Sequence, residues 1–371
     1  MLALLWATSA GTADDSWPPR QPPSDDVIIV GINRTNLAWE PAEVRKSTLE
    51  AMRASGIRAV RLSWRKPAAA MREVLDHAVA NDIAVLIEIP VDKRIVREGA
   101  VRRPGNGRLG SRYRLSDLDL LRFERLLAEI AAEIAERPLR VVALQFGNEI
   151  NWADFNGDLP LLEPGQGFEH VDDLPPPHRE AFESGLRLYA RALRTLRIFR
   201  DKTPSLADVA IVTAGLTALS DAISASGGSM VGREATFRRL EALGALAAAD
   251  GVALHIYRPF HPRLAPMPVD SVPLVAEELA LCGTRTAAYK PCWITEFGSS
   301  LPSGSCPSDD SRRARQIDVF FEQASHAGPG SVAAAFYYDW DQGRSWSVFR
   351  CGRVTEAGRA LVHWSGRLGS R

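Results

Sequence analysis

The sequence has no excess of either charge, because 45 Lys and Arg balance 45 Asp and Glu among its 371 residues. This balance excludes a strongly basic nucleic-acid binder and an acidic disordered chain as descriptions of the whole protein. No apolar run reaches about 18 residues, so we expect no membrane span. Only four cysteines are present and none forms a C-x-x-C pair, which excludes a zinc ribbon and a thioredoxin motif. No His, Cys and Asp cluster has metal-ligand spacing, and we expect no metal and no other cofactor.

The N-terminal segment differs in composition from the rest of the chain. Residues 1–7 are apolar, small residues follow them, and residues 14–26 contain four prolines and four aspartates. This order resembles a secretory signal peptide, although no Lys or Arg precedes the apolar part; a disordered tail is the alternative. We therefore divide the chain into a signal-like, Pro-rich segment over 1–26 and one folded domain over 27–371.

From Val27 onward, short β-branched apolar runs alternate with amphipathic or alanine-rich stretches. The expected strands are 27–33, 57–64, 83–89, 139–147, 208–215, 251–257, 292–297 and 331–339. The expected helices are 43–55, 67–81, 116–136, 179–203, 233–248, 269–282, 308–326 and 355–364. Apolar strands separated by helices indicate parallel βαβ units, and this number of them predicts a single (β/α)₈ TIM barrel. A doubly wound open sheet is the alternative, but its glycine-rich first turn is missing.

Polar residues stand at the ends of these apolar strands, where a barrel of this kind places its active site. Glu149 follows strand 139–147 and Glu296 ends strand 292–297. The fourth and seventh strands lie on opposite sides of an eight-stranded mouth, so the two side chains can face each other. Two facing carboxyl groups are the constellation that glycoside hydrolysis needs, one ionised and one protonated.

At these residues the sequence resembles the clan A glycoside hydrolases, which are retaining (β/α)₈ barrels with catalytic glutamates after the fourth and seventh strands. The resemblance implies that Glu296 is the nucleophile and Glu149, in the string GNEIN, is the acid/base. It also implies roles in supporting the nucleophile or binding sugar for Arg61, Asn148, His255, Tyr257 and Trp340, with Asn148 on the sugar 2-OH and Trp340 below the ring. GNEIN is similar to the family 53 endo-β-1,4-galactanases, whereas RLSW and FYYDW are similar to families 5 and 39.

Other residues at the strand ends are candidates for binding the substrate. Glu88 stands where family 5 commonly has a histidine; it either binds a sugar hydroxyl or pairs with Arg61, and we favour the pair. Asn33 and Trp152 are further candidates. Other tryptophans near the mouth could also stack on sugar rings, or instead be buried in the core: Trp39, Trp64 and Trp346.

Two long loops carry opposite charge. Loop 91–115 is rich in arginine and loop 152–178 is rich in Asp and Glu. The basic loop either forms a subsite for an anionic polysaccharide or pairs with its acidic neighbour and with water; we favour the second interpretation.

The cysteines all lie in the last quarter of the chain. Cys282 and Cys292 fall at the bottom of the expected barrel, and Cys306 and Cys351 fall in top loops. We therefore expect disulfides 282–292 and 306–351, which indicate export to an oxidising compartment. Four unpaired thiols in a cytosolic enzyme are the alternative.

Together these features predict a secreted or periplasmic retaining β-glycoside hydrolase. We expect it to be a monomer whose partner is a poly- or oligosaccharide substrate, which it cleaves in an endo-acting manner. A catalytically weak carbohydrate-binding barrel and a transglycosylase in exopolysaccharide or cell-wall metabolism are the alternatives. The presence of both glutamates argues against the binding barrel, whereas a transglycosylase would use the same residues.

Overall fold

The computed structural model describes most of the chain from Val27 to Gly369. The described residues are 27–65, 67–104, 111–161, 167–218, 229–257, 271–282, 290–300, 309–328, 330–342 and 345–369. The expected segment 1–26 and Cys306 lie outside them.

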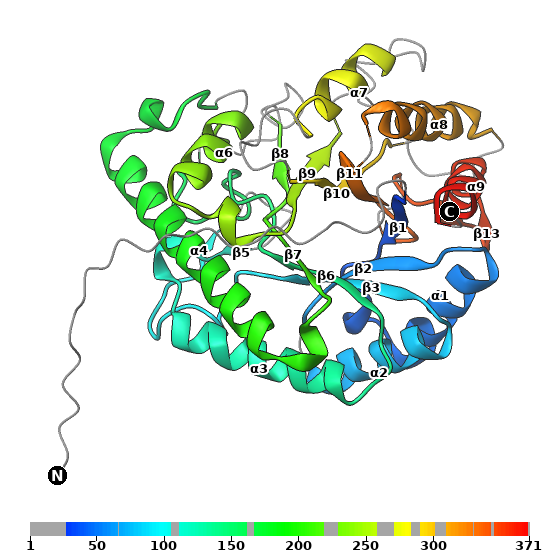
Figure 1. Ribbon diagram of the computed structural model, residues 1–371, viewed down its shortest axis with the longest axis horizontal. Helices are drawn as coiled ribbons and strands as arrows, with labels where there is room; N and C mark the ends of the chain where they lie inside the picture. The colour runs from blue at the N-terminus through cyan, green and yellow to red at the C-terminus, as the bar shows by residue number, and fades with distance from the viewer. Residues whose placement is uncertain are drawn as a thin grey trace.

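A parallel sheet forms the centre of the molecule, and Figure 1 shows helices around its outside. In hydrogen-bonded order its strands are β7 (Ala210–Val212), β6 (Val141–Phe146), β3 (Ala84–Ile89), β2 (Ala59–Ser63), β1 (Ile29–Asn33), β11 (Val332–Tyr337), β10 (Cys292–Phe297), β9 (Val252–Ile256) and β8 (Leu216–Thr217). Both faces of most strands are buried, as the continuous apolar runs predict.

The helices alternate with these strands along the chain. They are α1 (Ala42–Ala54), α2 (Ala68–Ala80), α3 (Leu120–Ala135), α4 (Pro176–Lys202), α6 (Arg233–Ala242), α7 (Ser271–Leu279), α8 (Ser311–His326) and α9 (Glu356–Gly369). Each apolar helix face packs on the outside of the sheet; in α3, for example, Phe123, Leu127 and Ile130 are buried. None of the described helices is both long and apolar enough to cross a membrane.

The sheet closes on itself through an interrupted fifth strand. β7 pairs with β6, and β8 pairs with β9. Residues 213–215 connect β7 to β8. Val212 bridges to Gly251 on one side and Asn148 bridges to Gly215 on the other. The prediction of a single (β/α)₈ barrel is therefore confirmed, and each expected strand and helix has a counterpart within a few residues.

The lower half of the barrel interior is filled by two large rings among small side chains. Trp293 and Phe336 form a buried cluster with alanines from neighbouring strands, such as Ala59 and Ala253. A Cβ atom added to Gly31 would lie 2.4 Å from the Phe336 ring, so glycine is required for this ring to fit. Because the lower interior is packed solid, the polar residues of the strands meet only at the C-terminal ends, which we call the mouth.

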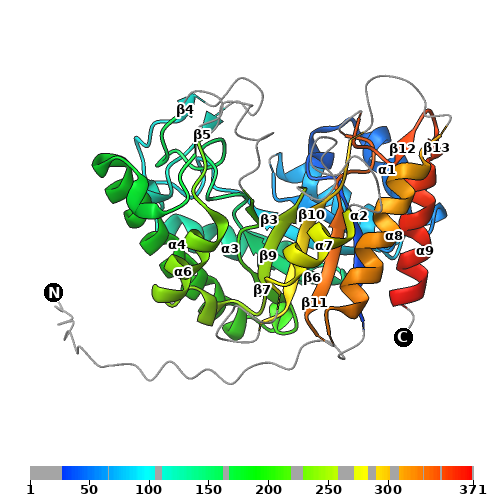
Figure 2. The same ribbon diagram turned by 90° about the horizontal axis from the view of Figure 1, so that it is seen from above.

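Two short hairpins extend from the loops around the barrel. They are β4 (Arg103–Pro104) with β5 (Ser111–Arg112), and β12 (Phe349–Arg350) with β13 (Arg353–Val354). Figure 2 shows both hairpins at the same edge of the barrel. The loops that carry them follow the C-terminal ends of β3 and β11, so they flank the mouth.

Candidate active site

Glu296 reaches the mouth because β10 is irregular near its end. The pairing of β10 with both neighbouring strands shifts register after Ile294. Thr295 points into the barrel, where its hydroxyl accepts a hydrogen bond from Gln145, and Phe297 packs outward on Phe320 of α8. In a regular strand Glu296 would alternate with Thr295 and face the helices. The bulge instead lets Glu296 project into the mouth.

Two hydrogen-bond donors hold the Glu296 carboxylate. Arg61 Nη1 donates to Oε1 at 2.5 Å, and the Tyr257 hydroxyl donates to Oε2 at 2.5 Å. Burial alone would raise the pKa of Glu296, but His255, Arg61 and the Tyr257 hydrogen bond together lower it below its usual value. Burial and the adjacent Glu296 charge raise the pKa of Tyr257 well above its usual value, so this residue stays a hydrogen-bond donor. Glu296 is therefore kept ionised and fixed in orientation.

Arg61 is itself fixed by amide oxygens. Its guanidinium donates to Gln145 Oε1 at 2.8 Å, to Asn33 Oδ1 at 2.9 Å and to Asn148 Oδ1 at 2.8 Å. Asn33 in turn donates to three backbone carbonyl oxygens of β10 and β11. Asn33 is completely buried, so its role is to hold Arg61 and three strands together rather than to contact a substrate.

Glu149 lies on the other side of the mouth, after β6. The residue has a left-handed backbone (φ 40°), and its N–H donates to Gly215 O at 2.9 Å. His255 Nδ1 lies 2.8 Å from Glu149 Oε1 and 3.7 Å from Glu296 Oε2. A Cβ atom on Gly215 would lie 2.1 Å from His255 Nε2, so the missing side chain makes room for the imidazole. Glycine in the interrupted fifth strand thus places His255 between the two glutamates.

The two carboxylates differ in protonation although they are close together. One oxygen of each glutamate and a ring nitrogen of His255 all lie within 4.8 Å of one another. Burial, with a smaller contribution from the Glu296 charge, raises the pKa of Glu149 above its usual value, while the pKa of Glu296 is lowered. The arrangement therefore favours a proton on Glu149 over a proton on Glu296.

Among the described residues, Glu149, His255 and Glu296 are the group whose ligand atoms could hold a metal ion. The donor set fits a cation poorly, because Arg61 places its positive charge 2.5 Å from Glu296 Oε1 and Tyr257 donates to Oε2. Both oxygens of one carboxylate are thus engaged by donors. The arrangement suits proton transfer and nucleophilic attack better than metal binding.

A cavity of about 480 Å³ opens beside these residues. Arg61, Asn148 and Glu296 lie at its base, and Glu88, Phe155 and Tyr338 form parts of its wall. Tyr338 also belongs to an aromatic cluster, with Tyr257 and Trp346 at edge-to-face distances of 5.3 to 6.4 Å. The cavity therefore offers polar groups and ring faces together, as a sugar-binding cleft requires.

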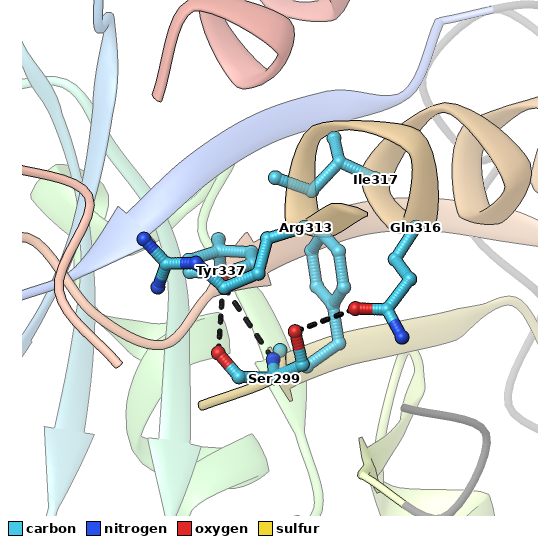
Figure 3. A pocket seen from close by; sticks show the side chains of 7 residues that line it. Ser299, Arg313, Gln316, Ile317 and Tyr337 are labelled. Carbon is cyan, nitrogen blue, oxygen red and sulfur yellow. Dashed lines mark hydrogen bonds between the residues drawn. The ribbon is translucent and has the colours of Figure 1, made fainter. Parts of the chain in front are cut away.

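A buried polar network supports the segment that follows Glu296. Figure 3 shows Ser299 between Tyr337 of β11 and Gln316 of α8. The Ser299 hydroxyl donates to Gln316 at 2.7 Å, and the Tyr337 hydroxyl donates to Ser299 O at 3.2 Å. In the same place, Arg313 donates to Trp346 O at 2.7 Å. One network thus positions both the end of β10 and the loop that carries Trp346.

Besides Asn33, the structure corrects the expectations for three further residues. Trp340 is buried with only 1% exposure and stacks on Phe349, so it packs in the core and does not line the cavity; Tyr338, two residues earlier, does. Glu88 does not pair with Arg61: it accepts a hydrogen bond from Ser63 and lines the cavity. Trp152 is half-buried against Phe155, and it is Phe155 that reaches the cavity.

The sequence interpretation missed Tyr338, Phe155 and Gln145. Only Gln145 carried a signal, as a polar residue inside the apolar strand 139–147. Trp39 does line the cavity, Trp64 is buried, and Trp346 lies in the aromatic cluster.

The charged loops interact mainly with protein groups. Arg94 bonds Asp92, and Arg97 bonds Asp117. Arg112 reaches across to loop 152–178, where it donates to backbone carbonyl oxygens, including that of Asn156. Of these three residues only Arg112 contacts the acidic loop, whereas Arg94 and Arg97 pair with acids outside it.

The first expected disulfide is present. Cys282 and Cys292 are bonded, with their Cα atoms 5.2 Å apart, at the end of β10 opposite the mouth. Cys351 is also disulfide-bonded. The expected pair 306–351 cannot be described further because Cys306 lies outside the described residues.

Solved structures with the same fold are numerous, although no protein-family model and no curated protein sequence matches the chain. An exo-β-1,4-mannosidase from Opitutaceae bacterium strain TAV5 matches 92% of this chain with a TM-score of 0.56 and 15% identity. The match spans only 59% of that mannosidase. An endo-1,4-β-mannanase from Rhizomucor miehei matches with a TM-score of 0.53 and 11% identity, covering 95% of this chain and 99% of its own.

A GH5_18 protein from Streptomyces cattleya, solved with GlcNAc, is similar at a TM-score of 0.56 and 15% identity. That match covers 94% of this chain and 82% of the Streptomyces protein. At such low identity these likenesses establish the fold: the chain has the (β/α)₈ barrel found in clan A glycoside hydrolases. The expected fold is thereby confirmed, and no single family is distinguished.

Proposed function

We propose that the protein is a retaining β-glycoside hydrolase with Glu296 as nucleophile and Glu149 as acid/base. The observation that carries the proposal is the pair of buried carboxylates, with oxygens within 4.8 Å and pKa values shifted in opposite directions. Retaining enzymes place their carboxyl groups about 5–5.5 Å apart, whereas inverting enzymes need about 6.5–9.5 Å to admit a water. The short separation supports retention.

The reaction would proceed by double displacement. Glu296 attacks the anomeric carbon, the glycosidic C–O bond breaks, and the proton of Glu149 passes to the leaving oxygen. Glu149, now ionised, takes a proton from water, whose oxygen attacks the anomeric carbon and releases Glu296. Arg61 and Tyr257 keep Glu296 ionised and aimed between turnovers. Asn148, which Arg61 holds by its Oδ1, has its amide nitrogen left to bind the sugar 2-OH.

The substrate would be a β-linked poly- or oligosaccharide, cleaved internally by a monomeric enzyme. Support comes from the open cavity and from fold neighbours titled as acting on β-1,4-mannosides. The disulfide Cys282–Cys292 is consistent with an oxidising compartment and supports secretion.

Azide rescue tests the two roles separately. With an aryl β-glycoside whose phenol is acidic, Glu149→Ala should form the glycosyl-enzyme but hydrolyse it slowly. Azide needs no general base, so it should restore turnover and give a β-configured glycosyl azide. Glu296→Ala should stay inactive or, with azide, give an inverted product. If azide gives the β product with Glu296→Ala while Glu149→Ala stays inert, the two roles are exchanged.

Glu124→Ala provides a matched control, because Glu124 is an exposed glutamate on α3. Product analysis with and without an acceptor sugar separates the alternatives. Binding without any product would indicate a carbohydrate-binding barrel, and longer oligosaccharides formed from the acceptor would indicate a transglycosylase.

A further inference from the structure

Arg65 lines the cavity with a charge that no acid neutralises directly. It follows β2, and its guanidinium carbon lies 5.3 Å from the centre of the Trp39 ring. Its Nε is buried and has no hydrogen-bond partner, and it forms no ion pair with any described residue. A buried guanidinium donor normally has a partner. The Arg65 side chain therefore packs on the Trp39 ring, and its guanidinium has N–H groups that donate to none of the described residues.

Arg102 lines the same cavity from the loop after β3. It is exposed, and within the described part of the chain it has neither an ion pair nor a hydrogen bond. The other cavity arginines differ, because Arg61 bonds Glu296 and Arg112 bonds backbone carbonyl oxygens. Arg65 and Arg102 are thus two positive charges in the cleft whose donors are available to a ligand.

The acidic groups of the cavity must be set against these charges. They are Glu88, Asp154 and Glu296. Glu296 is engaged by Arg61 and Tyr257, and Glu88 accepts from Ser63. Among the described residues that line it, the cavity therefore contains three carboxylates and the four guanidinium groups of Arg61, Arg65, Arg102 and Arg112. The formal charge of these lining residues is positive.

Trp39 indicates what kind of anion fits. It ends the short helix η1 (Leu37–Trp39), lines the cavity, and remains 59% exposed. A large exposed ring beside a guanidinium gives an apolar surface next to a positive charge. Pyranose rings stack on such surfaces through their C–H groups, whereas a free inorganic anion would gain nothing from the indole.

We propose that Arg65 and Arg102 form a subsite for the carboxylate of an acidic sugar residue, with Trp39 stacking against that pyranose ring. The inference rests on the proposed hydrolase function and narrows its substrate to β-linked polysaccharides that contain uronic acid. Guanidinium groups suit this ligand because they pair with carboxylates through two parallel hydrogen bonds.

Matched oligosaccharides that differ only at C6 test the subsite. The probes are hexasaccharides of β-1,4-mannuronate against β-1,4-mannose, and of β-1,4-glucuronate against β-1,4-glucose. Binding is measured calorimetrically with the full-length Glu149→Gln protein, so that turnover does not interfere. In at least one pair the acidic member should bind about tenfold tighter or more, because charge-assisted hydrogen bonds are strong. Added salt should reduce this preference.

Variants connect the preference to the proposed residues. Arg65→Gln and Arg102→Gln should each weaken binding of the acidic member towards that of the neutral one, and Trp39→Ala should weaken both. Arg125→Gln, an exposed arginine on α3, is the matched control and should change neither. Arg102 is exposed, so its variant is informative even if Arg65→Gln folds poorly.

The outcomes separate this inference from the proposed function. Neutral members that bind as tightly as acidic ones in both pairs, or a preference unaffected by both arginine variants, would overturn the subsite even if the wild type hydrolyses glycosides. An arginine-dependent acidic preference without hydrolysis by the wild type would retain the subsite and overturn the hydrolase.

Discussion

The ends of β10 and β6 each place one glutamate at the same mouth, but the two carboxyl groups have different hydrogen-bond partners. At β10, Glu296 receives hydrogen bonds from Arg61 and Tyr257, one to each oxygen. At β6, Glu149 is buried to a similar degree and has one side-chain partner, His255. Burial favours the protonated form of both, and only around Glu296 do the neighbouring groups, His255, Arg61 and Tyr257, outweigh it and lower the pKa.

This difference shows that the role of each carboxyl group depends on its neighbours rather than on its depth. It also predicts a bell-shaped pH dependence of kcat/KM. Activity falls as the pH drops through the lowered pKa of Glu296, which must be ionised. It also falls as the pH rises through the raised pKa of Glu149, which must be protonated. Substitutions around Glu149 and around Glu296 should therefore change different limbs of the pH profile.

The largest effect on kcat/KM is expected from replacing Glu149, which follows β6. Glu149→Gln should lower kcat/KM by about 10²–10⁴-fold on substrates with poor leaving groups, the usual contribution of a general acid. The basic limb of the pH profile should disappear, while the acidic limb should remain because Glu296 is unchanged. A basic limb that persists in this variant would contradict the assignment of Glu149.

A smaller effect is expected at the β10 side. Tyr257→Phe removes one donor to the ionised Glu296, and a hydrogen bond to a charged group contributes about 1.5–3 kcal/mol, or roughly 10- to 100-fold in kcat/KM. Because the donor favours the ionised form, its loss raises the pKa of Glu296 and moves the acidic limb to higher pH. The basic limb serves as the internal control. An acidic limb that stays in place would show that Tyr257 does not stabilise the ionised form of Glu296.

His255 lies between Glu149 and Glu296, and its removal should affect both limbs of the pH profile. The imidazole lowers the pKa of Glu149 and of Glu296 alike. His255→Gln should therefore move the acidic and the basic limbs to higher pH together, with the optimum following them. Measuring kcat/KM across pH distinguishes this joint movement from the single-limb shift of Tyr257→Phe. If only one limb moves, His255 serves only one of the glutamates.

Removing the disulfide at the start of β10 should have the smallest effect on catalysis. Replacing both Cys282 and Cys292 by serine opens a loop with a sequence separation of 10 at the end of the barrel opposite the mouth. We expect a loss of about 2–3 kcal/mol in the free energy of unfolding, as loop-closure entropy gives, and unchanged kcat/KM at 25 °C. Denaturant unfolding measures the first and initial rates the second. A large loss of activity in the folded variant would mean that the mouth depends on the bottom of the barrel.

Much of the site could be predicted because strand ends converge in a closed parallel barrel. Glu149, Glu296, Arg61 and His255 all follow or end apolar strands, and the barrel brings them to one mouth. The roles of Trp340 and Glu88 could not be predicted in the same way. Trp340 lies beyond the end of β11, where side-chain alternation gives no guidance, whereas Glu88 lies within β3 and accepts a hydrogen bond from Ser63 of the neighbouring strand β2.

The sequence by itself determined the barrel, since alternating apolar strands and amphipathic helices leave few other ways to bury both faces of a sheet. It also placed Glu149 and Glu296 at the C-terminal ends of two strands. Only the tertiary structure decided how they differ. The bulge after Ile294 turns Glu296 towards Arg61, and the absent side chain of Gly215 admits His255 beside Glu149. Both depend on contacts between strands distant in sequence, and the pKa of a buried group responds to such contacts within a few ångströms.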